Sequence, residues 1–396
     1  MIKKFLKAVF VSFLALAAVS CGGGGSDSDD EENTTYYQVS FFNDGEVYNT
    51  QSVQSGKRAQ RPVAPQKEGY NFIGWYETPN FTRRYRFESR VVDSQLNLYA
   101  RWKSTDYKEI QEVTIDTRIQ GSNIFIEDEN GVRQITIPHL LVCDHEVTQA
   151  EWKEYMTWHG TERGGNNKPQ SKYGLGDNFP TYYVNWYECI IYCNLRSEAE
   201  GLVPAYYIEI DGENSTDIAN WMKVDESHIE LDSNGKYFYD NTNNSAFLNQ
   251  IKCDINASGY RIPTEAEWEY IARGGESNDA VYEPLDGCAW HFGNSGNPRT
   301  MHEVKQKLPN TLGMYDMLGN ASEICYDRYG TITSQTDIFG ADGPKCVRRG
   351  GCYNDKAEYT SGSGYESGCN ISSRGDPKSP SARSQYGGLR VVCTVD

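Results

Sequence analysis

Three short phrases rich in glycine and aromatic residues, all in the second half of the chain, constrain its fold most strongly. Residues 261–270 read RIPTEAEWEY and run into ARGG at 272–275, residues 313–320 read GMYDMLGN, and residues 347–351 read VRRGG. Between them lie mostly turns and short strands. The whole chain of 396 residues holds 37 Gly, 28 Tyr and eight Trp. This density predicts a loop-rich globular protein whose loops are held by side-chain packing more than by regular ladders.

In this order the phrases resemble the formylglycine-generating, or sulfatase-modifying factor, family, whose fold is an irregular relative of the C-type lectin fold. The resemblance extends over roughly 110–392 and includes 137–148 and 180–186, where Tyr182 and Asn185 depart from the usual pattern. It implies an α+β fold, with an irregular C-type lectin-like domain over residues 105–396.

The chain departs from the family where the family's enzymes do their chemistry. The resemblance places a reactive cysteine pair, which binds copper and activates oxygen, shortly after the final Gly-Gly, but here those positions hold Asp355 and Thr360. Cu(I) is a soft ion that needs thiolates, which neither residue supplies. We therefore predict no catalytic residue and no copper. Cys352 and Cys369 lie nearby, and a relocated oxidase site that uses them is the alternative.

The same resemblance implies a calcium site in the loop that follows the second phrase. Calcium favours hard oxygen ligands in flexible arrays. Ser322 and Ile324 replace two tryptophans that the family usually carries there, and the alternative is that the polar residues only hydrogen-bond the loop. The candidate ligands are Leu318, Gly319, Asn320, Ala321 and Glu323.

The C-terminal segment 352–388 is rich in Tyr, Ser, Gly and Asn, and Ile371 is its only large aliphatic residue. These are the residues of antibody paratopes, in which Tyr gives large contact area and the small polar residues give adaptable hydrogen bonds. The segment resembles the variable region of retroelement-diversified proteins built on this lectin-like frame, and the alternative is a plain polar surface loop. The candidate ligand-binding residues are Tyr353, Asn354, Asp355, Tyr359, Ser361, Tyr365, Asn370, Ser372, Asp376, Lys378, Ser384 and Tyr386.

Three helices are predicted by their N-terminal caps, because a cap side chain and a Glu three residues later satisfy amide groups that have no partner within the helix. Glycines mark two of the helix ends, Gly201 and Gly274. Residues 207–254, rich in Asn, Asp and Ser, are predicted to form a long surface insertion. The three capping pairs are Thr148 with Glu151, Asn185 with Glu188, and Thr264 with Glu267.

Residues 37–104 read as a separate small β unit. Its alternating segment 38–42, its turn signal at 43–45 and the phrases GYNFIGWY at 69–76 and LYARW at 98–102 resemble the internalin-type B-repeat, also called the Listeria–Bacteroides repeat. That module is β-grasp-like. So small a domain needs large side chains in its core, which we expect to include Phe72, Trp75, Tyr99 and Trp102. We expect a spacer, with carbohydrate stacking as the alternative.

The N-terminus predicts export and a lipid anchor. Lysines at positions 3, 4 and 7 precede an apolar run at 8–19 that is too short to span a bilayer. Residues 18–21 (AVSC) resemble a relaxed bacterial lipobox, in which Cys21 would be lipidated after removal of the signal peptide; an ordinary signal peptide is the alternative. Residues 22–36 then form a flexible acidic tether. The acidic run resembles a surface-export signal, so we expect the protein on the outer membrane, facing outward.

The net charge of −17 argues against nucleic acid as a partner, because such binding requires Lys and Arg to neutralise phosphates. Ten cysteines follow Cys21, and their pairing cannot be derived from their spacing. Three classes of function remain: a surface-anchored binder of an unknown protein or glycan, an oxidase with displaced cysteines, and a structural adhesion spacer. The missing cysteine pair and the paratope-like segment favour the binder.

Overall fold

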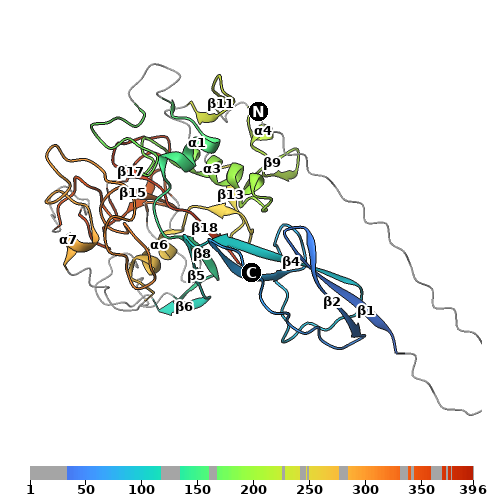
Figure 1. The fold of residues 1–396 in the computed structure, drawn as a ribbon. Helices are drawn as coiled ribbons and strands as arrows, with labels where there is room; N and C mark the ends of the chain where they lie inside the picture. Colours follow the sequence, from blue (N-terminus) through green and yellow to red (C-terminus); the bar gives the residue numbers. More distant parts are fainter. Residues whose placement is uncertain are drawn as a thin grey trace, which may run out of the picture.

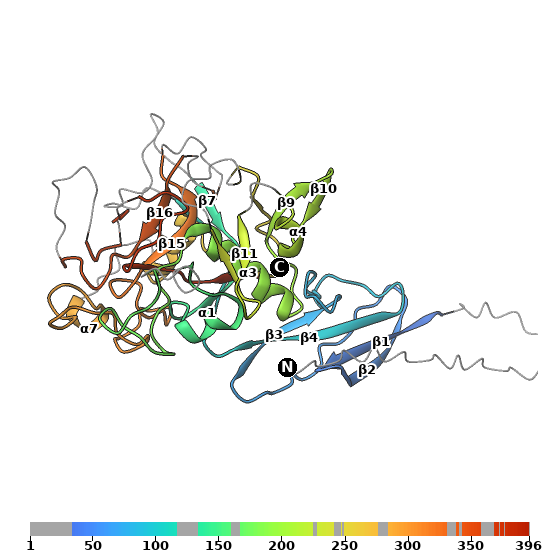
Figure 2. The same ribbon diagram turned by 90° about the horizontal axis from the view of Figure 1, so that it is seen from above.

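The computed structural model describes a small β unit that projects from one side of a larger mixed domain (Figures 1 and 2). The described residues are 34–116, 134–159, 167–224, 228–240, 247, 249–275, 284–330, 338–339, 343–357, 368–371, 373–375 and 377–395. The predicted calcium loop lies within them. Of the predicted ligand-binding residues, Tyr359, Ser361, Tyr365, Ser372 and Asp376 lie outside the described residues, as do Thr360 and Cys21.

The small unit is a four-stranded sheet with strand order β2-β1-β4-β3. The two central strands run parallel, and each edge strand pairs with its neighbour in antiparallel fashion. The tight turn between the first two strands passes through Asp44 and Gly45, both at positive φ, as the Asn-Asp-Gly turn signal predicts. The strands are β1 (Tyr36–Asn43), β2 (Glu46–Gln54), β3 (Tyr70–Tyr76) and β4 (Leu96–Ser104).

Large aromatic side chains fill the core of this unit, as its size requires. Trp75 is 2% exposed and packs edge-on against Phe41, with ring centroids 4.9 Å apart. Phe72 and Trp102 are half-buried and pack against the same core. Tyr99 is half-buried and stacks on Phe42 at 5.5 Å. The aromatic phrases therefore serve mainly to close the sheet.

The larger domain is built from several short sheets and few helices. A four-stranded sheet of order β14-β18-β8-β5 brings the last strand of the chain next to one of the first strands of this domain, and a three-stranded sheet of order β16-β15-β17 lies beside it. The strands are β5 (Tyr107–Ile110), β6 (Val113–Asp116), β7 (Gln134–Ile137), β8 (Leu140–Cys143), β14 (Tyr260–Arg261), β15 (Ser322–Arg328), β16 (Cys346–Arg349), β17 (Gly387–Gly388) and β18 (Val392–Thr394).

The three predicted helices are confirmed, each with both hydrogen bonds of its capping box. They are α1 (Gln149–Tyr155), α3 (Trp186–Ala199) and α6 (Glu265–Ala272). Gly201 and Gly274 follow the last two at φ +72° each, the left-handed conformation that glycine adopts without strain. Two shorter helices are α4 (Ile218–Trp221) and α7 (Leu285–Cys288).

The prediction of a surface insertion over 207–254 is wrong for much of that stretch. Side chains from it, including Ile208, Trp221 and Tyr239, are fully buried in the same core as α3. The scattered apolar residues provide the packing surface, although Asn, Asp and Ser dominate the composition. The elements here are β9 (Tyr206–Ile210), β10 (Glu213–Ser215), β11 (Ile229–Leu231), β12 (Tyr237–Tyr239) and β13 (Lys252–Cys253).

The small unit is packed tightly against the larger domain. The Tyr76 hydroxyl donates to the carbonyl of Val395 at 3.0 Å, and its ring belongs to the core of the larger domain. Arg101, 1% exposed, donates to the carbonyl of Ser258 at 3.1 Å. Lys103 pairs with Glu200 at 3.0 Å. Because Tyr76, Arg101 and Lys103 are buried and paired at this contact, the two parts share a packed interface.

Within the described part of the chain, no helix has the length and apolar character needed to cross a bilayer.

Candidate functional site

The phrase at 261–270 builds a buried network of ion pairs on α6. Arg261 donates to both carboxylate oxygens of Glu267 at 2.6 Å, and both side chains are almost completely buried. Glu269 pairs with Arg273 at 2.7 Å and with Arg349, from the VRRGG phrase, at 2.9 Å. Buried charges are tolerated only when each one is paired. We call the larger domain outside residues 352–388 the frame. The paired charged residues of these two phrases hold the frame together and are not free to act on a substrate.

The glycines of the VRRGG phrase allow close backbone contacts. Gly350 and Gly351 have φ of +87° and +70°, and a Cβ at Gly351 would lie 2.6 Å from the carbonyl oxygen of Gly368. Only glycine fits this position without strain. The two glycines thus bring the start of the C-terminal segment against its own middle.

The side-chain oxygens of Asn320 and Glu323 in the predicted calcium loop accept hydrogen bonds from protein donors. Glu323 is 1% exposed, and its carboxylate accepts from Arg390 Nη2 at 2.6 Å and from Trp268 Nε1 at 2.7 Å. Asn320 accepts from the amide of His302 through Oδ1 and donates to Glu146 through Nδ2. Leu318, Gly319 and Ala321 are buried. A guanidinium held against the acidic ligand does not fit a calcium ion, so this arrangement matches the alternative of a hydrogen-bonded loop.

A second acidic cluster is neutralised in a similar way. The carboxylates of Asp106 and Asp144 lie close to His145, and these are the only three groups among the described residues with metal-ligand spacing. Lys305 Nζ lies 3.0 Å from Asp106 and 3.0 Å from Asp144. The ammonium group occupies the place that a cation would take.

The cysteines near the end of the chain lie in the core. Cys352 is 4% exposed and Cys369 is 2% exposed, and the Cys369 thiol donates to the carbonyl of Cys352 at 3.4 Å. Burial, followed by the nearby Asp355 carboxylate, raises the pKa of both thiols. A reactive cysteine needs the opposite, a lowered thiol pKa and access. The surroundings of this pair therefore disfavour a relocated oxidase site.

Asp355 caps the turn that begins the C-terminal segment. Its carboxylate accepts from the amide of Cys352 at 2.9 Å, and its carbonyl accepts from Phe292 at 2.8 Å. Its side chain is half-buried, like that of Asn354.

The rest of the segment is held by its main chain. Carbonyls along 371–386 accept hydrogen bonds from donors of the frame. Cys346 donates to Lys378, and Trp186 donates to Pro380 at 2.9 Å. The remaining donors are Arg349 to Ile371, Asn185 to Ser381, Arg348 to Ala382, Tyr183 to Ser384, and Ser322 to Tyr386. These carbonyl contacts exist whatever side chain the residue carries. Two side chains of the segment also anchor it, because Arg374 pairs with Glu265 and Arg383 pairs with Glu188, each at 2.7 Å.

The predicted ligand-binding residues divide by burial. Asn354, Asp355, Asn370, Lys378, Ser384 and Tyr386 are half-buried. Tyr353, in contrast, is 2% exposed and packs in the core, with its ring 5.6 Å from that of Tyr386. Tyr353 therefore packs beneath the face formed by these half-buried residues and does not lie on its surface.

Two tyrosines outside the segment extend this face, and sequence reasoning missed their role. The ring of Tyr173 is half-buried and lies 6.4 Å from that of Tyr183, which is 9% exposed. Tyr182, fully buried, packs 5.3 Å from Tyr183 and supports it. Burial raises the pKa of Tyr183, with Tyr173 and then Tyr386 adding to the effect, so the Tyr386 hydroxyl is near as well. Tyr183 has φ +57°, a rare conformation for a bulky residue and one that occurs at functional sites. The sequence signal that could have indicated this role was the departure of Tyr182 from the family pattern.

The comparisons with known proteins agree with this architecture. Residues 103–395 match the family model described as a sulfatase-modifying factor enzyme 1-like domain, and residues 37–101 match the Listeria-Bacteroides repeat domain. The chain therefore belongs to the FGE-sulfatase family, and its predicted α+β, lectin-like fold is confirmed.

Particular relatives can be named. The solved structure of Treponema denticola variable protein 1 is 28% identical, with a TM-score of 0.53, over 72% of this chain and 94% of that one. "Chaperone protein LppX" of Paenibacillus barcinonensis is 31% identical over 49% of this chain and 64% of its own length. The formylglycine-generating enzyme of Bos taurus is 22% identical over 68% of this chain and 69% of its own. The chain spans less than two thirds of the first curated relatives it matches.

Proposed function

We propose that this protein is a non-catalytic ligand-binding lipoprotein, held at the bacterial outer membrane by a lipid on Cys21. Its ligand, a protein or a glycan, would bind the face formed by the C-terminal segment 352–388 together with Tyr173 and Tyr183. Two observations support the non-catalytic part of the proposal: Asp355 stands where the family's enzymes have a cysteine, and the thiols of Cys352 and Cys369 are buried with raised pKa values.

The observation that carries the proposal is the way the segment is anchored. Its carbonyls accept hydrogen bonds from Cys346, Trp186 and Tyr183, whereas side chains such as Ser384 and Tyr386 remain half-buried at the surface. Apart from Arg374 and Arg383, which pair with buried glutamates, positions of the segment that are held through their carbonyls can present different side chains without loss of the frame. That property suits a recognition surface, in which aromatic and small polar groups supply contact area and adaptable hydrogen bonds.

The relatives support two further parts of the proposal. The solved structural neighbour is named a variable protein, which fits a segment whose side chains change between copies. We extend this to diversification of codons 352–388 by a retroelement. A protein of Evansella cellulosilytica that matches 38% of this chain is named a putative membrane protein, which fits attachment to a membrane.

Two experiments test the proposal. The nucleotide sequence of this locus in several isolates should show substitutions confined to codons 352–388, beside a near-identical template and a reverse-transcriptase gene. Even variation along the gene, with no template, would contradict diversification but would leave a binder of fixed specificity.

The second experiment separates binding from catalysis. A chain lacking residues 1–21 should bind a component of a glycan or surface-protein array. That signal should be lost in Tyr386→Ala and kept in the distant Lys223→Ala. The same chain should leave a Cys-x-Pro-x-Arg peptide unoxidised when copper is supplied. Robust turnover of that peptide would overturn the non-catalytic assignment.

A further inference from the structure

Charge is divided unevenly between the two parts of the chain. Residues 34–104 carry ten Lys and Arg against six Asp and Glu, whereas residues 105–396 carry 25 against 44. The small unit therefore has a net charge of +4 and the larger domain a net charge of −19. Such asymmetry points to a function for the small unit that involves anions.

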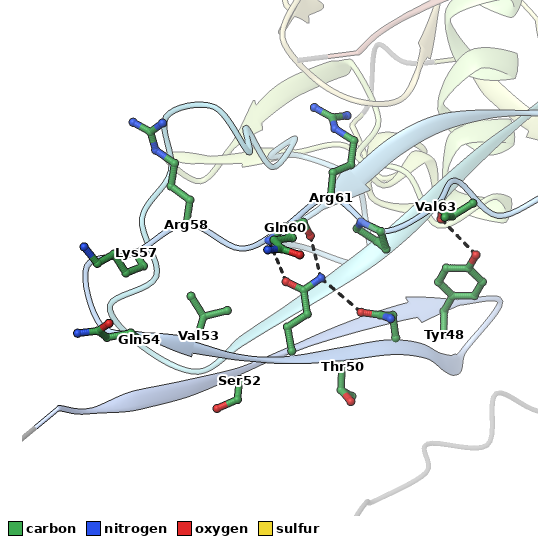
Figure 3. A pocket seen from close by; sticks show the side chains of 13 residues that line it. Tyr48, Thr50, Ser52, Val53, Gln54, Lys57, Arg58, Gln60, Arg61 and Val63 are labelled. Atoms are coloured by element: carbon green, nitrogen blue, oxygen red, sulfur yellow. Dashed lines mark hydrogen bonds between the residues drawn. The ribbon is translucent and has the colours of Figure 1, made fainter.

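The small unit also contains a groove of about 900 Å³, between β2 and the segment 57–63 that passes above it (Figure 3). β2 is the outer edge strand of the sheet, whereas contacts with the larger domain come from residues of β3 and β4 such as Tyr76 and Arg101. The groove therefore lies at the edge of the sheet opposite β3.

Hydrogen bonds fix the shape of this groove. Gln51 donates through Nε2 to the carbonyl of Gln60 at 2.8 Å and accepts from the amide of Gln60 at 2.9 Å. The Tyr48 hydroxyl donates to the carbonyl of Val63 at 3.1 Å. Directly before the first of these ties, Ala59 is 5% exposed and packs into the core. The segment 57–63 is therefore a built wall of the groove.

Three cations project from this wall. Lys57 and Arg58 are exposed and have no acidic partner among the described residues. Arg61 lies over the ring of Phe87 at 4.7 Å and pairs with Glu88 at 2.6 Å, in a contact that is open to solvent on both sides. Figure 3 shows the guanidinium groups of Arg58 and Arg61 extending to the same side of the segment, away from β2, so that they line the rim of the groove. Exposed cations on a fixed wall can pair with anions that lie along the groove.

We propose that this groove binds a linear anionic polysaccharide that bears carboxylates. The strand that forms its floor runs from residue 48 to residue 54 over roughly 20 Å, which is long enough for several sugar rings. The amide groups of Asn49 and Gln54 offer hydrogen bonds to hydroxyls, whereas the Gln51 amide is engaged by Gln60. Tyr48, 41% exposed, offers an aromatic face. A flat bilayer would reach the cations but would leave the groove and its amides unused.

The test uses the chain from residue 22 onward and a fluorescently labelled oligogalacturonate of defined length, with a neutral dextran oligomer as the control probe. We expect oligogalacturonate to bind and dextran not to bind. Affinity should fall several-fold between 50 and 200 mM salt, because exposed charge pairs are screened. The double variant Lys57→Ala, Arg58→Ala should bind at least about tenfold more weakly, since both charge-assisted contacts are lost.

Two controls separate the groove from net charge. Lys168→Ala with Lys223→Ala removes the same charge from exposed positions of the larger domain and should change affinity less than about twofold. Gln51→Ala keeps every charge but breaks the ties to Gln60, and should weaken binding without altering the circular dichroism spectrum.

Several results would overturn the proposal. They are an absence of oligogalacturonate binding by the unmodified chain, equal losses in the two double variants, and binding as tight to phosphatidylglycerol vesicles or single-stranded DNA. If Gln51→Ala unfolds the small unit, Asn49→Ala replaces it. If Asn49→Ala then binds oligogalacturonate as tightly as the unmodified chain, the amide groups of β2 do not contribute to binding.

Discussion

The helix α6 and the C-terminal segment 371–386 are both polar, but they use their polar groups in opposite ways. Around α6, side chains such as Glu267 and Glu269 are buried and paired with arginines. Along the segment the main chain makes many of the bonds, and side chains such as Ser384 stay half-buried at the surface. Arg374 and Arg383 are the exceptions, because each pairs with a buried glutamate. Substitutions should therefore be costly around α6 and at these two arginines, and cheap at the half-buried positions of the segment that make no such pair.

Removal of a buried arginine should have the largest effect. Arg390→Ala leaves Glu323 as a buried charge without its partner and should lower the free energy of unfolding by about 3–5 kcal/mol. Urea unfolding followed by tryptophan fluorescence measures this change. Arg61→Ala, which breaks the exposed pair with Glu88, should cost less than about 1 kcal/mol. Similar costs for the two variants would erase the distinction between frame and surface.

Two tyrosines in contact sharpen the boundary between the regions. Tyr353→Ala should cost about 3–4 kcal/mol, because it empties a buried site in the core. Tyr386→Ala should cost about 1 kcal/mol, since its ring is only half-buried. The same unfolding experiment compares them. If Tyr386→Ala proves as costly as Tyr353→Ala, Tyr386 belongs to the frame and cannot serve as a replaceable contact.

The buried carboxyl of Asp316 gives the frame a pH dependence. Its Oδ2 accepts from the amide of Lys305 at 2.7 Å, and its Oδ1 has no hydrogen-bond partner. Burial raises the pKa of Asp316 to about 6, above the value of about 3.9 in an unfolded chain. The folded state therefore binds this proton more tightly, so stability from this group is greatest below about pH 4 and falls as the pH rises towards 6.

Asp316→Asn removes that loss, because the amide is never charged. We expect a gain of about 1–3 kcal/mol at pH 7.5 and almost none at pH 4, measured as thermal unfolding at both pH values. A gain of equal size at both pH values would mean that folding does not raise the pKa of this carboxyl.

The smallest effect is expected within the segment itself. Asn354→Ala should change stability by less than about 0.5 kcal/mol, because the main chain anchors this turn. The matched change in the frame, Asn185→Ala, removes the cap of α3 and should cost about 1 kcal/mol. Both are measured by thermal unfolding. If Asn354→Ala lowers stability more than Asn185→Ala does, the distinction between segment and frame fails.

Local signals in the sequence were enough for part of this structure. Each capping pair, such as Thr264 with Glu267, lies within one helical turn, so the helices were predicted and confirmed. The Listeria–Bacteroides repeat and the family fold were likewise predicted from phrases that are contiguous in the chain. The prediction over 207–254 was wrong because it rested on composition. Composition averages over residues such as Trp221 and cannot show which of them are buried.

By itself, the sequence determined the family, the capped helices, the small β unit and the position where the enzymes' cysteine is absent. Only the tertiary structure decided that Glu323 pairs with Arg390, that Tyr183 approaches Tyr386, that Tyr353 is core, and that the small unit is packed against the larger domain. These contacts join residues far apart in the chain. Their existence depends on burial and on the geometry of the assembled frame, which no local pattern encodes.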